Sequence, residues 1–131
     1  MGINAKKELL NIIGYHKILC AEIVYSPSIF DESDKKDYIE HGWLIDSLEI
    51  TLKYPHTEEE LQEFITKLDF NYDNGYGGQK LKGGVILDDY AWLTRGEYDG
   101  SEWWEYHKRP EIPDKLKNLQ LEREININKL V

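Results

Sequence analysis

With 131 residues, one cysteine and a formal net charge of −9 at pH 7, the chain is long enough for a single domain over residues 1–131 and cannot form an internal disulfide. The lack of a secretory signal and of any run of about 18 apolar residues predicts a cytoplasmic protein without a membrane span. The negative charge argues against direct binding of nucleic acid, because that affinity comes from Lys and Arg that displace counterions from phosphates.

Residues 4–14 predict a short helix. Asn4 is a suitable N-cap, and Gly14 can end the helix in the left-handed conformation. The apolar residues that share one side of this helix are Leu9, Leu10, Ile12 and Ile13. We expect that side to pack on the core.

Two segments alternate apolar and polar side chains, which is typical of half-buried strands. The first runs from Lys17 to Tyr25 and ends before Pro27, and its expected buried residues are Leu19, Ala21, Ile23 and Tyr25. The second has the clearest alternation in the chain, and its expected buried residues are Leu48, Ile50, Leu52 and Tyr54. Between the two segments, Ser33 can cap a polar turn or short helix that ends at Gly42.

Thr57 and Glu60 match a capping box, in which each side chain satisfies the free backbone N–H of the other residue. The apolar residues that follow at helical spacing are Leu61, Phe64, Ile65 and Leu68. They predict a second helix with one buried face. Residues 71–78 are rich in Gly and Asn and predict an irregular loop.

The segments 81–87, 90–98 and 101–108 predict successive strands, joined by tight turns at Asp88-Asp89 and Asp99-Gly100. After Pro113, the spacing of apolar residues indicates a short helix or an extended tail, and these residues are Leu116, Leu119, Leu121 and Ile125. We therefore expect an α+β fold, with a single antiparallel sheet of about five strands and the two helices packed on one face.

The final hairpin is rich in aromatic residues and holds three of the four Trp of the chain within residues 92–106. If the Asp99-Gly100 turn has two residues, one face carries Tyr90, Trp92, Thr94, Tyr98, Trp103, Glu105 and His107. The other face then carries Leu93, Arg95, Glu97, Glu102, Trp104 and Tyr106. In this register Glu97 lies opposite Glu102, so either the register shifts or the pair of like charges awaits a cation.

One face of the hairpin is expected to pack on a helix, and the second face either packs its aromatic rings edge to face or leaves part of them exposed among charged residues. Exposed aromatic residues with Arg are typical of binding hot spots. The candidate binding residues of the hairpin are Arg95, Glu97, Tyr98, Asp99, Glu102, Trp103, Trp104 and Tyr106. In the acidic segment 31–63, the candidates that could mimic phosphates are Asp31, Glu32, Asp34 and Asp37. The alternative for that segment is ordinary solvated surface.

We expect no catalytic site, no metal site and no cofactor, because the residue patterns of such sites do not occur. The histidines stand far apart without metal-ligand spacing, at His16, His41, His56 and His107. The alternative is a small glycan- or nucleotide-processing enzyme, whose carboxylates would come from Glu97, Glu102 or Glu105. A virion assembly subunit is a further alternative.

Residues 83–113 resemble a recurring segment of small phage and prophage proteins. The resemblance is carried by Trp92-Leu93, Arg95, the run from Glu97 to Tyr106, Pro110 and Pro113, and less distinctively by residues 48–78. It implies an origin in a mobile element and no enzyme activity, and it assigns no role to any single residue. With the acidic charge, it leads us to expect a monomer or small homo-oligomer that binds and inhibits a protein of a bacterial host. The most specific form of this functional prediction is an anti-CRISPR-like inhibitor that covers the basic nucleic-acid-binding surface of an effector.

Overall fold

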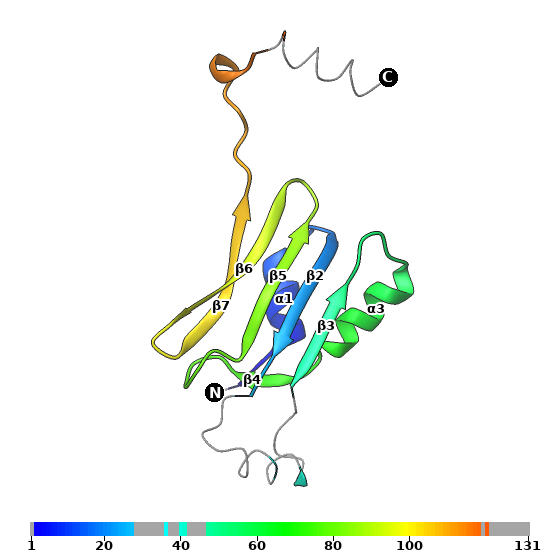
Figure 1. The fold of residues 1–131 in the computed structure, drawn as a ribbon, viewed down its shortest axis with the longest axis vertical. Helices are drawn as coiled ribbons and strands as arrows, with labels where there is room; N and C mark the ends of the chain where they lie inside the picture. The colour runs from blue at the N-terminus through cyan, green and yellow to red at the C-terminus, as the bar shows by residue number, and fades with distance from the viewer. Residues whose placement is uncertain (1, 28–35, 37–39, 42–46, 119, 121–131) are drawn as a thin grey trace.

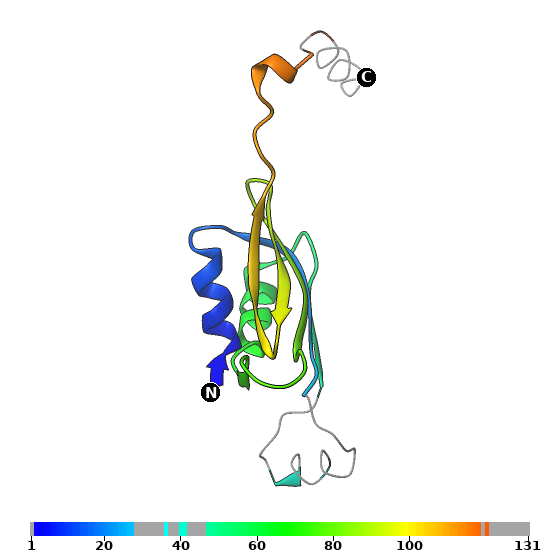
Figure 2. The same cartoon turned by 90° about the vertical axis from the view of Figure 1, so that its left-hand side faces the viewer.

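The computed structural model describes residues 2–27, 36, 40–41, 47–118 and 120, and within them the fold is α+β as predicted (Figure 1). The main sheet of this described part is antiparallel, with five strands in the order β3-β2-β5-β6-β7. Its strands are β2 (Ile18–Tyr25), β3 (Leu48–Leu52), β5 (Leu81–Leu87), β6 (Ala91–Tyr98) and β7 (Ser101–Lys108). Helices α1 (Ala5–Ile13) and α3 (Glu58–Lys67) lie on the same face of the sheet (Figure 2).

A small second sheet joins the N-terminus to the segment after α3. Strand β1 (Gly2–Asn4) pairs antiparallel with β4 (Asn71–Asp73), and the N–H of Ala5 donates to the carbonyl oxygen of Phe70 at 2.9 Å. Strand β4 therefore occupies the start of the segment that was expected to be an irregular loop. Local sequence patterns do not predict this strand, because its partner is far away along the chain.

Both helices begin where their caps predicted. The side chain of Asn4 accepts a hydrogen bond from the N–H of Lys7 at 3.0 Å, and Gly14 ends α1 with φ of 56°. The capping box is formed, since the N–H of Glu60 donates to Thr57 Oγ1 and the N–H of Thr57 donates to Glu60 Oε1, both at 3.1 Å. The buried stripe of α1 is narrower than expected and consists of Ala5, Leu9 and Ile13, whereas Leu10 and Ile12 are exposed.

Strand β2 contains an irregularity that the alternation did not predict. Its register against β5 shifts between Ile18 and Cys20, so Ile18 faces the core and Leu19 is only half-buried. The prediction of Leu19 as a core residue was therefore wrong. An extra residue in one strand interrupts the alternation, so side chains on the two sides of the irregularity follow different patterns of facing the core. Tyr54 is also exposed, since it lies beyond the end of β3.

The two tight turns differ in how well they were predicted. In the β6–β7 turn, Asp99 and Gly100 have φ of 48° and 87°, and Tyr98 pairs with Ser101 as expected. In the β5–β6 turn, the N–H of Ala91 donates to the carbonyl oxygen of Asp88 at 3.2 Å, so the central residues are Asp89 and Tyr90. This turn lies one residue later than predicted, and Tyr90 precedes β6 instead of opening it.

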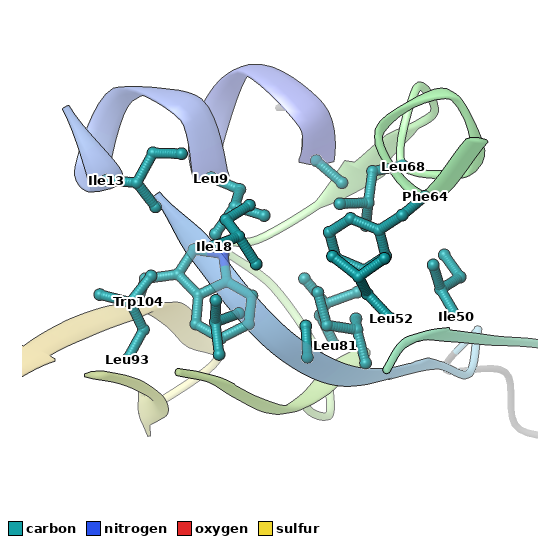
Figure 3. Close-up of a cluster of buried hydrophobic side chains, with 14 of the residues drawn as sticks. Leu9, Ile13, Ile18, Ile50, Leu52, Phe64, Leu68, Leu81, Leu93 and Trp104 are labelled. Carbon is teal, nitrogen blue, oxygen red and sulfur yellow. The ribbon is translucent and has the colours of Figure 1, made fainter. Parts of the chain in front are cut away.

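The core lies between the sheet and the two helices (Figure 3). Its labelled side chains in that view are Leu9, Ile13, Ile18, Ile50, Leu52, Phe64, Leu68, Leu81, Leu93 and Trp104. After β7 the chain continues to η1 (Asp114–Leu116), a single 3-10 turn. Most of the segment from Ser33 to Gly42, namely residues 33–35, 37–39 and 42, lies outside the described residues, as do Leu119, Leu121 and Ile125. Among the helices that are described, none is both long and apolar enough to cross a membrane.

Candidate partner-binding surface

The hairpin face that carries Arg95 and Glu102 packs inward. The side chains of Arg95 and Glu102 are 2% and 1% exposed, and Arg95 Nη2 lies 2.7 Å from Glu102 Oε1. The carboxylate of Glu102 also accepts the backbone N–H groups of Lys80 at 2.7 Å and of Leu81 at 2.9 Å. Glu97 does lie opposite Glu102. Of these two carboxylates, the buried one, Glu102, is paired with Arg95 of the same hairpin.

Glu8 and Tyr72 complete a buried polar cluster around Arg95. Arg95 Nη1 lies 3.3 Å from Glu8 Oε1, Arg95 Nη2 donates to the Tyr72 hydroxyl at 2.9 Å, and that hydroxyl donates to Glu8. Burial, together with the hydrogen bond to Glu8, raises the pKa of Tyr72 well above its ordinary value. Because these residues come from α1, β4 and β6, the cluster joins the helix layer and the small sheet to the hairpin.

Trp104 lies under the same guanidinium group, with Arg95 Cζ 4.8 Å from the centre of the indole ring. Trp104 is only 6% exposed, and its Nε1 has no hydrogen-bond partner among the described residues. Arg95, Glu102 and Trp104 were expected to be exposed for binding, and this expectation was wrong. Their face of the hairpin packs on α1, so these three side chains are buried.

The β6–β7 turn and the glycine-rich loop after β4 form one exposed surface. The N–H of Glu102 donates to the carbonyl oxygen of Asn74 at 2.8 Å, and a Cβ on Gly100 would lie 3.4 Å from the backbone nitrogen of Gly77. The side chains that this contact brings to the same end of the molecule are Asp73, Tyr76, Glu97, Tyr98 and Asp99. We call these five residues the acidic tip; Tyr76 and Tyr98 are 74% and 76% exposed, and Asp73 is half-buried.

Glu102 fixes both ends of the loop that carries Tyr76. Its backbone N–H holds Asn74 at the start of the loop, and its carboxylate holds Lys80 at the end. Within the loop, Asp73 Oδ1 accepts the N–H of Gly75 at 2.9 Å, which lowers the pKa of the Asp73 carboxyl. The Lys80 ammonium group donates to the carbonyl oxygen of Gly78 at 3.3 Å. These hydrogen bonds hold both ends of the loop against the hairpin.

Trp92 and Trp103 of the hairpin lie on the face of the sheet opposite the helices. Trp92 and Trp103 are 39% and 38% exposed. Trp92 stacks on His107 with ring centres 5.3 Å apart, and Trp103 covers Gly96, where a Cβ would lie 2.7 Å from the indole nitrogen. A shallow groove of about 1270 Å³ beside Trp92 has a largely apolar lining. Some aromatic side chains of the hairpin therefore remain partly exposed, as predicted. They lie on the face that carries Trp92 and Trp103, and not on the face that carries Arg95.

Tyr106 is exposed at the edge of the sheet and belongs to a separate chain of polar contacts. Its hydroxyl oxygen lies 3.0 Å from His16 Nε2, and His16 Nδ1 lies 2.9 Å from Asp88 Oδ1. Asp88 also accepts the N–H of Lys17 at 3.1 Å. The hydrogen bond from His16, followed by that from Lys17, lowers the pKa of the Asp88 carboxyl below its ordinary value. These contacts join the end of α1 to the β5–β6 turn and to β7.

The His16–Asp88 pair predicts a loss of stability in acid. A carboxyl group with a lowered pKa in the folded state contributes stability above its unfolded value of 3.8, and that contribution disappears as pH falls through the folded value. We expect the free energy of unfolding to decrease more steeply below about pH 4 in the wild type than in Asp88→Asn. Urea unfolding at a series of pH values measures this difference, and equal slopes for the two proteins would contradict it.

The carboxylates considered for an enzyme do not converge on one cleft. Glu97 belongs to the acidic tip, Glu102 is buried, and Glu105 lies on the open face of the sheet. Within the described part of the chain, His, Cys, Asp and Glu form no group of three or more that could hold a metal ion.

The structure brings together Glu97, Tyr98 and Asp99 of the predicted binding residues, and separates them from Trp103 and Tyr106. The four acidic candidates of the segment before β3, which are Asp31, Glu32, Asp34 and Asp37, lie outside the described residues. Sequence reasoning missed Asp73 and Tyr76 as surface residues of the same site. The glycine-rich composition of residues 71–78 marked an unusual loop, but its contact with Gly100 is visible only in three dimensions. No protein-family model, curated protein or solved structure matches the chain.

Proposed function

We propose that this protein binds and inhibits another protein, and that the acidic tip contacts a basic surface of that partner. Two exposed tyrosines supply large apolar contact area with little loss of side-chain entropy, as in many binding hot spots. Asp73, Glu97 and Asp99 supply negative charge around these rings. Complementary charge accelerates association and selects the partner.

The partner class that best fits this surface is a nucleic-acid-binding protein. Such a protein carries Lys and Arg for phosphates, and carboxylates at the tip can occupy the same positions. The exposed acids of α3, which are Glu58, Glu59, Glu60 and Glu63, extend the negative field of the molecule. The phage-like segment 83–113 narrows the proposal to an inhibitor of a bacterial defence effector, acting in the manner of an anti-CRISPR protein.

One observation carries this proposal, namely the way in which the tip is held. The Arg95–Glu102 ion pair is buried beneath the tip, and Glu102 bonds to both ends of the loop that presents Tyr76. A preformed acidic surface with exposed aromatic rings is what an inhibitor requires in order to bind tightly without large rearrangement.

The test compares a tip variant with a matched variant elsewhere. The tip variant combines Glu97→Gln, Tyr98→Ala and Asp99→Asn, where Asn is chosen because it tolerates the positive φ of residue 99. The control combines Glu59→Gln and Glu63→Gln on the exposed side of α3. Each protein is titrated against the basic proteins that the wild type retains from a bacterial lysate, and the displacement of DNA from those proteins is measured.

We expect the tip variant to lose at least about 30-fold in affinity and in DNA displacement, since a Tyr hot spot is worth about 2 kcal/mol or more. The α3 control should lose less than about threefold, because surface charges away from the interface contribute little. Wild-type binding should also weaken by at least about tenfold between about 50 and 500 mM salt. Unchanged binding by the tip variant, or binding that is insensitive to salt, would contradict the proposal.

A further inference from the structure

Strand β7 is the last strand of the main sheet, and its outer edge is uncovered in the described part of the chain. Figure 2 looks onto this edge, with α1 to one side and β6 behind. The strand runs over eight residues, Ser101–Lys108, with no proline and no shift in its register against β6. Proteins usually blunt such edges with prolines, bulges or short strands, because a free edge can pair with another strand.

The hydrogen bonds at the two ends of β7 show which backbone groups point outward. At one end, the N–H of Arg109 donates to Tyr90 across the hairpin at 3.1 Å. At the other end, the N–H of Glu102 points away from the hairpin and donates to Asn74 at 2.8 Å. Because antiparallel residues alternate between the two directions, odd-numbered residues bond to β6 and even-numbered residues point outward. Three residues have outward backbone groups that form no hydrogen bond with a described residue, namely Trp104, Tyr106 and Lys108.

We propose that a second copy of this chain pairs with this edge, β7 against β7, antiparallel and centred on Tyr106. The free stretch from Trp104 to Lys108 is symmetric about Tyr106, as a two-fold axis requires. Pairing stops beyond Trp104 because Asn74 already accepts the Glu102 N–H, and beyond Arg109 because Pro110 has no N–H to donate. The two sheets then join into one continuous sheet.

The side chains in this register complement one another, which favours a second copy over an unrelated strand. On the open face of the sheet, Glu105 lies opposite His107 of the other copy, and Trp103 lies opposite Arg109. Each of these pairs occurs twice by symmetry, and each opposes an acid to a base or an aromatic ring to a cation. On the helix face, the two Tyr106 rings lie side by side at the axis, where cross-strand aromatic pairs are favourable.

The experiment measures the mass of the full chain by sedimentation velocity, from about 5 to 500 µM, since dimerisation follows mass action. We expect the wild type to change from monomer to dimer over this range. Tyr106→Pro removes the central outward N–H and should stay monomeric throughout. The matched variant Tyr106→Val removes the same ring and hydroxyl but keeps the N–H, and should still form dimers.

A second measurement keeps the proposal testable if the proline variant fails to fold. In the wild type, amide hydrogen exchange at Trp104, Tyr106 and Lys108 should slow at least tenfold at the high concentration. The amides of Trp103, Glu105 and His107 already bond to β6 and should change little. A chain that remains monomeric at every concentration overturns the proposal and leaves the edge to a strand of another protein. Dimers of unchanged affinity in Tyr106→Pro, or no change in exchange at Tyr106, also overturn it.

Discussion

Replacement of Arg95 by Leu should destabilise the protein by about 3–5 kcal/mol, the usual cost of removing one member of a buried ion pair. Arg95 is the cation that lies between the carboxylates of Glu8 and Glu102, at 3.3 Å and 2.7 Å. Without it, two carboxylates remain buried, and the Tyr72 hydroxyl loses a donor. Urea unfolding at neutral pH measures the loss as a lower midpoint with a similar slope.

The control for this variant is Glu97→Gln, on the same strand. Glu97 lies directly opposite Glu102 but is exposed, so removing its charge should change the stability by no more than about 0.5 kcal/mol. If Arg95→Leu lowered the free energy of unfolding as little as Glu97→Gln, the buried cluster would not hold the hairpin against α1. Partial unfolding of the loop that carries Tyr76 should accompany the loss of Arg95, because Glu102 would no longer be held beneath it.

Gly83→Ala is the second substitution with a large expected effect, and we expect a loss of about 3 kcal/mol or more. Gly83 lies in β5 beside Ile23 of β2 and has a φ of 130°, a conformation that L residues rarely adopt. A Cβ at this position would lie 1.9 Å from the carbonyl oxygen of Glu22. That oxygen belongs to the backbone of the neighbouring strand, so the two strands would have to separate.

The neighbouring glycine provides the control. A Cβ on Gly84 would meet the carbonyl oxygen of Leu93 at 3.4 Å, an ordinary contact, and its φ is not positive. Gly84→Ala should therefore change the stability by less than about 1 kcal/mol, and the reduced freedom of the unfolded chain favours it. Thermal or urea unfolding of both variants measures the difference. Similar stabilities for the two would show that β5 can shift away from β2 at low cost.

The sequence alone determined the features that depend on neighbouring residues. The helix starts followed from Asn4 and from the Thr57–Glu60 capping box, where side chains and free backbone groups lie within one turn of each other. The register of the last hairpin followed from Asp99-Gly100, because two positive φ angles close a two-residue turn. The α+β class followed from the succession of these elements.

The tertiary structure decided which face of the hairpin is buried. Alternation divides the hairpin into two faces, but each face carries aromatic and charged residues, so the pattern does not favour either. The choice depends on α1, whose Glu8 supplies a buried partner for Arg95 and whose Leu9 and Ile13 cover Trp104 (Figure 3). The acidic tip could not be predicted from the sequence either, because Glu102 joins Asn74 and Lys80 through contacts that form only when distant strands come together.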